Sequence, residues 1–236
     1  MIIFALLLSA VAFAFTFVFA KKSWQTVLAL LFGAVFVASL VLTTMNFAQH
    51  FGMKKVAETK DVELVSSADV EGLELLLYKP LGDGTEKVYL YQTPESKKPQ
   101  PTATDNVVNQ IKSGAAQAVL TTESTYWEYE NDFYRFLFGI VNNEHELIAT
   151  TNTFHLPDTW EVLSVKQVEQ FGKLAKARQA SMKEEAQTYI QEQLLLAMSE
   201  DPLLAFDEAK QQELIQQWTA EFQADALQQL LDEVKK

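Results

Sequence analysis

The first 48 residues of the chain contain no acidic residue and only two basic ones, Lys21 and Lys22, which divide the segment into two apolar runs. Residues 1–20 are uncharged. A helix of that length, rising about 1.5 Å per residue, crosses a hydrocarbon core of about 30 Å. Residues 24–48 form a second uncharged run, long enough to span with some tilt. The pattern predicts a transmembrane hairpin with helices at 1–20 and 24–48 and a short basic turn at 21–23.

A cleaved secretory signal is the alternative interpretation of the first run, because residues 18–20 loosely fit a cleavage site. A signal peptide begins with a basic region, however, and nothing charged precedes Lys21. The chain has no cysteine, which excludes a lipoprotein anchor and a disulfide framework. Two membrane helices pack through small residues spaced four apart. The runs offer three such pairs: Ala5 with Ser9, Ala10 with Ala14, and Ala29 with Gly33.

Membrane orientation follows the side that carries Lys and Arg. The short turn with Lys21 and Lys22 is therefore expected on the cytoplasmic side of the membrane. Both termini of the chain would then lie on the extracytoplasmic side. Three lysines after the second run, Lys54, Lys55 and Lys60, favour the opposite orientation, with the C-terminal part of the chain in the cytoplasm. We favour a two-pass protein of the cell membrane with an extracytoplasmic body. The residues that we assign to the membrane interface are Lys21, Lys22, Trp24, Lys54 and Lys55.

The remaining chain is strongly acidic. Residues 56–236 hold all 31 acidic residues but only 15 of the 19 basic ones, an excess of 16 negative charges. A phosphate-binding groove needs clustered Lys and Arg, so nucleic acid is excluded as a partner. About 180 residues are enough to bury a hydrophobic core.

Residues 56–163 are rich in β-branched and aromatic residues and predict a small, mostly antiparallel β domain of about six to eight strands. Apolar runs at 73–79 and 87–93 flank a turn that contains Pro80, Gly82 and Gly84. A second hairpin is expected from 117–130 and 133–141, with Asn131 and Asp132 at its turn. Residues 146–154 follow as a further strand, and 107–111 are expected to form a helical turn.

Residues 164–236 predict helices at about 164–199 and 207–235, because good helix formers dominate and Ser164 is a suitable N-cap. Apolar residues recur along one face of the last helix and need a partner: the preceding helix, the sheet or another subunit. Trp218, Phe222 and Leu230 are the tentative interaction surface of this face. The predicted fold class is an α+β membrane protein with a two-helix transmembrane hairpin, a small antiparallel β domain and long C-terminal helices.

No catalytic, cofactor or metal site is predicted. The three histidines, His50, His145 and His155, lack the spacing of a zinc site. The chain contains no GxSxG, SxxK or glycine-rich phosphate loop. Glu128 with Asp132 would be a glycosidase-like carboxylate pair, but such a pair has little specificity in so acidic a chain.

A dense aromatic cluster lies at residues 126–138. Strand alternation places Tyr126 and Glu128 on one face and Trp127 and Tyr129 on the other, so one set should be core. An exposed set would suit stacking on a sugar or on a protein partner. Core packing is the favoured interpretation.

Two closely spaced N-terminal spans, the Lys21–Lys22 turn, and the segments PTATDNVVNQI and STYWEYENDFYRFLFG resemble a family of uncharacterised two-span membrane proteins from lactic-acid bacteria, a domain of unknown function. The resemblance covers nearly the whole chain. It implies a bacterial cell-membrane protein and carries over no catalytic residue.

These observations lead to one functional hypothesis and two alternatives. The leading hypothesis is a non-enzymatic, membrane-anchored interaction module that contacts the lipid bilayer and a protein or cell-envelope partner. The first alternative is an accessory subunit of a membrane complex. The second is a cell-envelope hydrolase that uses scattered acidic residues. The sequence does not predict the ligand or the oligomeric state.

Overall fold

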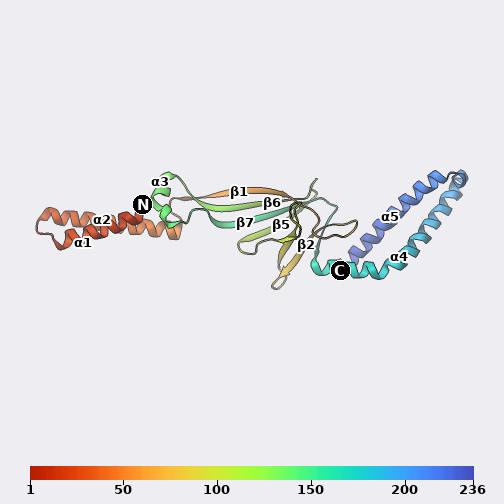
Figure 1. The fold of residues 1–236 in the computed structure, drawn as a ribbon, viewed down its shortest axis with the longest axis horizontal. Helices are drawn as coiled ribbons and strands as arrows, with labels where there is room; N and C mark the ends of the chain where they lie inside the picture. The colour runs from red at the N-terminus through yellow and green to blue at the C-terminus, as the bar shows by residue number, and fades with distance from the viewer. The chain divides into compact units, whose positions relative to one another are not determined.

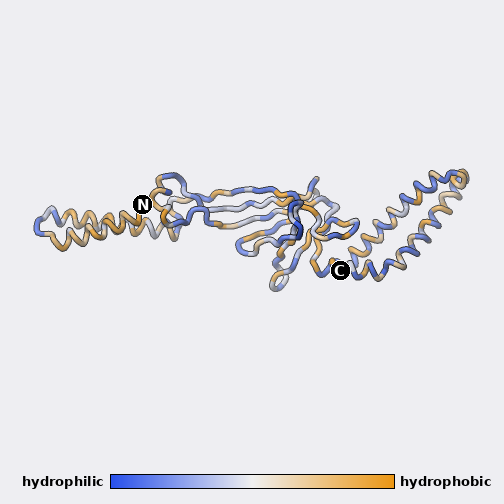
Figure 2. Tube along the Cα trace, viewed as in Figure 1, coloured by the Kyte–Doolittle hydropathy of each residue, from blue (hydrophilic) through white to orange (hydrophobic). Residues whose placement is uncertain are grey.

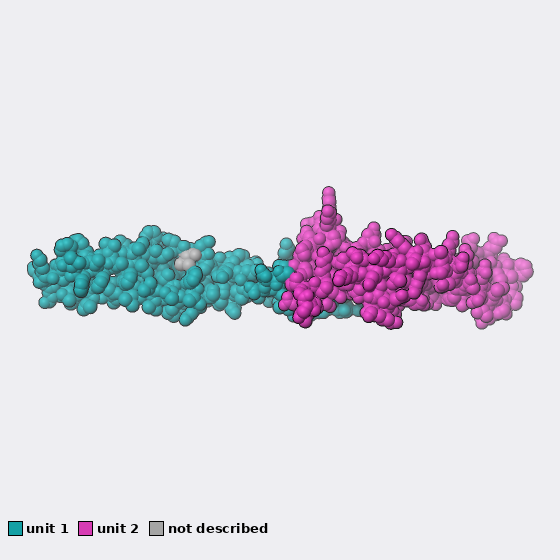
Figure 3. Space-filling view, turned by 90° about the horizontal axis from the view of Figure 1, so that it is seen from below, with its two compact units in different colours: residues 1–64, 103–158 teal, residues 65–102, 159–236 magenta. Residues whose placement is uncertain are grey.

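The computed structural model describes residues 1–236, apart from the side chain of Val141. The chain forms two compact units, which Figure 3 shows in different colours. Unit 1 comprises Met1–Leu64 and Ala103–Asp158, and unit 2 comprises Val65–Thr102 and Thr159–Lys236. The fold class is α+β, as predicted, but both sheets are mixed rather than antiparallel.

Unit 1 begins with two apolar helices, α1 (Ile2–Val18) and α2 (Ser23–Gln49), which pack side by side as a hairpin (Figure 1). Among the described residues, α2 is the one helix long and apolar enough to cross a membrane, and α1 is a shorter apolar helix of 17 residues. Both are mostly hydrophobic in Figure 2.

Small residues lie where the two helices meet. Ser9 and Ala29 are buried, and a Cβ atom added to Gly33 would lie 3.2 Å from the Phe13 ring. These three members of the predicted small-residue pairs therefore lie at the contact, whereas Ala5 is exposed.

The sheet of unit 1 has the strand order β1-β6-β7-β5. Its strands are β1 (Met53–Glu63), β5 (Val107–Ser113), β6 (Val119–Tyr129) and β7 (Glu146–Leu156). β6 pairs antiparallel with β1 and β7, and Met53 lies opposite Tyr129. β5 pairs parallel with β7. Only three residues separate α2 from the first strand, which starts at Met53, before the predicted boundary at residue 56.

Two predicted elements of unit 1 are wrong. Residues 107–111 belong to strand β5 rather than a helical turn, because β-branched side chains and pairing with β7 favour extended backbone. The segment predicted as a strand at 133–141 instead forms α3 (Asp132–Phe138) and η1 (Gly139–Val141). The Asn131 side chain caps α3 by accepting hydrogen bonds from the backbone N–H groups of Phe133 and Tyr134 at 3.0 and 3.2 Å.

The sheet of unit 2 has the strand order β4-β3-β2-β8. β2 (Glu74–Leu81) and β3 (Glu86–Tyr91) form the predicted antiparallel hairpin. The short β4 (Gln100–Pro101) extends the sheet beside β3, and β8 (Trp160–Ser164) pairs parallel with β2.

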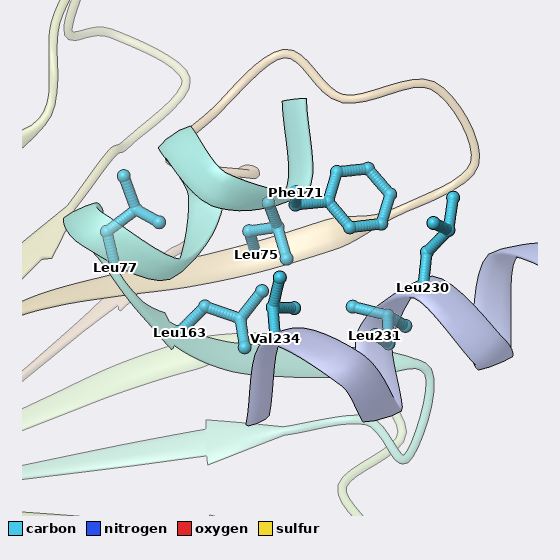
Figure 4. Close-up of a cluster of buried hydrophobic side chains, with 7 residues drawn as sticks. All are labelled: Leu75, Leu77, Leu163, Phe171, Leu230, Leu231 and Val234. Atoms are coloured by element: carbon cyan, nitrogen blue, oxygen red, sulfur yellow. The ribbon is translucent and has the colours of Figure 1, made fainter. Parts of the chain in front are cut away.

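Two long helices follow β8, as predicted: α4 (Val165–Glu200) and α5 (Glu208–Lys235), joined by η2 (Pro202–Phe206). Ser164 and Gln167 form a reciprocal capping box that starts α4 directly after β8. The core of unit 2 joins these helices to the sheet (Figure 4). It consists of Leu75, Leu77, Leu163, Phe171, Leu230, Leu231 and Val234.

Gly52, in the link between α2 and β1, is a sharp test of this fold. Its φ is +79°, and an added Cβ would lie 2.5 Å from the Tyr134 ring. Gly52→Ala should therefore lower the free energy of unfolding by about 1–3 kcal/mol through backbone strain and overlap. Gly82 is the matched control, because its φ is +56° but nothing lies within 4 Å of its added Cβ. Gly82→Ala should therefore lower the free energy of unfolding by less than Gly52→Ala does. Thermal unfolding of both full-length variants in detergent checks this, and equal losses would contradict it.

Candidate functional site

The candidate site lies at the open end of the α1–α2 hairpin, where the apolar helices meet the sheet of unit 1. Ile2 of α1, Met53 of β1, Tyr129 of β6 and Phe138 of α3 are buried together there, and we name these four residues the hairpin-base cluster. Half-buried apolar residues pack around it: Ile3, Leu42, Phe51, Trp127, Tyr134 and Leu137. The cluster joins both helices of the hairpin to the strands by direct packing.

A short hydrogen-bond network accompanies this packing. The fully buried Asn46 of α2 donates to the Phe51 carbonyl at 2.9 Å and accepts from the Asn143 amide at 3.2 Å. The Tyr129 hydroxyl donates to Asn143 Oδ1 at 2.5 Å. Burial, followed by the nearby charge of Glu144, raises the pKa of Tyr129, so the phenol stays protonated as a donor. The side-chain amide of Asn46, near the end of α2, thus finds its hydrogen-bond partners within unit 1.

Histidine and aromatic rings stack on both faces of β6. His50, the left-handed residue that ends α2, stacks on Trp127 with ring centroids 4.2 Å apart. On the other face His145 stacks on Tyr126 at 4.1 Å, and its Nδ1 lies 3.1 Å from Glu128 Oε1. The predicted alternation of Tyr126 and Glu128 against Trp127 and Tyr129 agrees with these contacts.

Arg135 neutralises the acidic residues around α3. Its guanidinium contacts Glu144 at 2.7 Å and Asp132 at 3.0 Å. The hydrogen bond and the charge of Glu144 raise the pKa of Arg135, with a smaller effect of Asp132. The ion pairs tie α3 to the loop that precedes β7.

The residues predicted for the membrane interface lie at opposite ends of the hairpin. Lys21, Lys22 and Trp24 are exposed at the turn between α1 and α2, where Gln25 Oε1 accepts hydrogen bonds from both lysine backbone N–H groups. Lys54 and Lys55 are exposed at the start of β1, and Lys55 Nζ lies 5.4 Å from the centre of the Trp127 ring. The predicted interface residues therefore form two separate sets, one at each end of the hairpin.

The tentative interaction surface on α5 packs largely within unit 2. Leu230 is buried in the core, and the Phe222 ring lies 5.7 Å from that of Tyr189 on α4. Trp218 is half-buried. The apolar face of α5 therefore finds α4 and β2 as partners within the chain.

The sequence reasoning missed a different exposed patch, at the end of the α4–α5 pair. Leu203 and Phe206 of η2 are 76% and 88% exposed, and Leu195 and Leu196 of α4 are also exposed. We name these four residues the tip patch. The apolar letters of LLLAM and PLLAF around the predicted helix break were the available signal, since a break leaves apolar side chains without a helical neighbour.

The carboxylates and histidines that could serve in catalysis or metal binding do not form a common site. Glu128 pairs with His145, whereas Asp132 pairs with Arg135. Among the described residues, no group of three or more His, Asp or Glu side chains is placed to hold a metal ion. His155 lies on β7 opposite Val119 of β6.

Residues 21–171, from the hairpin turn to the second turn of α4, match the family described as Domain of unknown function (DUF4811). The chain belongs to this family. The match includes α2, all eight strands and α3, so the DUF4811 segment contains most of the candidate site. No curated protein and no solved structure matches the chain. The resemblance to a family of unknown function is confirmed, while its two spans and bacterial source stay predictions.

Substitutions in the network test whether it supports the junction. Tyr129→Phe removes one hydrogen bond and should lower the free energy of unfolding by about 1 kcal/mol. Asn46→Ala leaves the Phe51 carbonyl and the Asn143 amide without this partner. It should therefore lower the free energy of unfolding by about 1–3 kcal/mol. Denaturant unfolding in detergent measures both. Because both side chains contact Asn143, the double variant should lose less than the sum, and strict additivity would contradict a shared network.

Proposed function

We propose that this protein is a two-pass, membrane-anchored interaction module without catalytic activity, and that its strands and C-terminal helices lie outside the cytoplasm. The observation that carries the proposal is the outer surface of the α1–α2 hairpin. Large apolar side chains there are exposed, among them Leu8, Phe15, Leu30 and Phe47, each at least 66% exposed. Soluble proteins rarely expose so large a contiguous apolar surface, whereas a lipid bilayer solvates it.

The contacts of α1 favour a retained span over a cleaved signal. Ile2 is buried in the hairpin-base cluster, and Ser9 is buried between the helices. Removal of residues 1–20 would expose Met53 and Phe138 to solvent. Because α1 contributes buried side chains to the folded protein, its retention, and with it the two-pass arrangement, is supported.

The orientation rests on the short basic turn. Lys21 and Lys22 are exposed in the short connection between α1 and α2, residues 19–22, and such a connection tends to remain in the cytoplasm. Lys54 and Lys55, at the other end of the hairpin, act in the opposite direction. We give the first loop more weight because the first helix usually sets topology.

The tip patch supports an interaction role for unit 2. Its leucines and Phe206 are next to the acidic residues Glu200, Asp201, Asp207 and Glu208, all exposed. An apolar centre with an acidic rim is complementary to a protein surface that has an apolar centre and a basic rim. Such a protein is the partner that we propose for the body.

A groove along the hairpin favours a second candidate, an accessory subunit of a membrane complex. This groove has a volume of about 770 Å³ and is lined by small and apolar side chains, including Gly33, Ala34 and Ala38. Small residues allow close approach of another membrane helix. In this candidate the hairpin itself carries the interaction.

Cysteine labelling of intact cells tests the anchored topology, because the chain has no cysteine of its own. Lys97 is exposed in the loop between β3 and β4, and Ser23 is exposed at the hairpin turn. With an impermeant maleimide, the Lys97→Cys variant should react and the Ser23→Cys variant should react only after lysis. The reverse pattern would place the body in the cytoplasm. Labelling of both would contradict the two-pass arrangement.

Co-purification in detergent separates the two candidates. Ala38→Trp fills the groove, whereas Val27→Trp places the same ring on an exposed position that does not line it. If the protein is a subunit, Ala38→Trp should lose membrane partners that the wild type and Val27→Trp retain. Unchanged partners in both variants would leave the anchored module as the function and contradict the subunit.

A further inference from the structure

Helix α3 has two chemically different sides. Phe133 and Phe136 are 65% and 63% exposed, and Ile140 of the following turn is 48% exposed. Their spacing of three and four residues places them on one side. The other side carries Phe138, a member of the hairpin-base cluster, with Tyr134 and Leu137, which pack against the cluster. The exposed side is therefore apolar although the helix is firmly attached to unit 1.

Direct bonds hold α3 at the level where α1 begins. The Met1 amino group donates to the carbonyls of Phe136 and Leu137 at 2.9 and 2.8 Å. These carbonyls belong to the last turn of α3, where a cation is favourable. Burial of Ile2 beside Phe138 adds apolar contact to the same connection. Figure 1 shows α3 next to the N-terminus.

The length of α1 fixes the depth of this connection if the hairpin crosses a bilayer. Its 17 residues span about 25 Å, which is less than a hydrocarbon core of about 30 Å. With the charged Lys21 and Lys22 at one headgroup layer, the 20 residues before them reach about 30 Å, so the beginning of α1 lies at the opposite boundary between acyl chains and headgroups. Because α3 is hydrogen-bonded to that point, α3 lies at the same boundary.

We propose that α3 lies in the membrane interface and inserts Phe133, Phe136 and Ile140 among the lipid acyl chains beside the hairpin. The inference rests on the proposed membrane anchor and adds a second lipid contact to it. Three exposed apolar side chains on one side of a helix are what an interfacial helix presents to lipid. Its two charged residues, Asp132 and Arg135, are paired with each other and with Glu144, which lowers their cost near lipid.

Depth-dependent fluorescence quenching of the full chain in phosphatidylcholine vesicles tests the proposal. Single cysteines at Phe136, Val35 and Glu123 carry the same environment-sensitive dye. Val35 is near the middle of α2, and Glu123 is an exposed residue of β6, about 20 Å along the strand from Tyr129. Spin-labelled lipids with the quencher near the headgroup or near the chain end report depth, and aqueous iodide reports exposure to water.

The expected result is quenching of the Phe136 dye by the shallow lipid at least twofold more strongly than by the deep lipid, with protection from iodide. The Val35 dye should respond mainly to the deep lipid, and the Glu123 dye to iodide alone. A second label at Phe133 should behave as the Phe136 label does.

Two other outcomes have distinct meanings. If Val35 responds to deep lipid while Phe136 and Phe133 respond only to iodide, the hairpin is inserted but α3 faces water, and the inference about α3 is overturned. If Val35 also responds only to iodide, the proposed anchor itself fails. Phe136 is exposed, so the label there is the primary one, whereas the Phe133 ring also contacts the Tyr134 ring, with ring centroids 5.8 Å apart. Circular dichroism of each variant checks that α3 keeps its packing on the cluster.

Discussion

The junction between α2 and β1 is the constraint on which unit 1 depends. Only His50, Phe51 and Gly52 separate a long apolar helix from an eleven-residue strand. The chain passes from helix to strand through positive φ values at His50 and Gly52. Polar groups at this point are satisfied inside the protein, since the Asn46 amide reaches the Phe51 carbonyl and Asn143. A flexible linker would leave the strands free to move relative to the hairpin, whereas this junction fixes them to it.

This coupling shapes the functional account. A hairpin that only tethers a domain needs no packing between its helices and the strands, yet Ile2 of α1 is buried in one cluster with Met53 of β1 and Tyr129 of β6. In our proposal, unit 1 is an anchor whose helices are packed directly on its own sheet. Unit 2 has its own core and ends in the exposed tip patch on η2 and α4. An anchor in one unit and a contact surface in the other is the division of roles that we propose for this member of the DUF4811 family.

Local sequence patterns predicted the elements whose signals are local. The two apolar runs, the turn around Gly82 and the cap at Ser164 gave helices and a hairpin within a few residues of those observed. Parallel pairing of β5 with β7 and of β2 with β8 depends on residues distant in sequence, so no local pattern indicated it. Helix α3 was missed because aromatic residues suggested a strand, although Asn131 as a cap and Gly139 as an end mark a helix. The tip patch gave no periodic signal, because its apolar residues lie around a helix break and not along one helix face.

The most direct test of the central claim is the state of the full-length protein in cells that express it. Membranes are washed with alkaline carbonate, which strips peripheral proteins, and the intact mass of the protein is then measured in pellet and supernatant. Our account predicts a protein in the pellet whose mass includes residues 1–20, that is, at least the 26.6 kDa of residues 1–236. A protein in the supernatant whose mass lacks those residues would contradict the account, because α1 would then be a removed signal rather than a span.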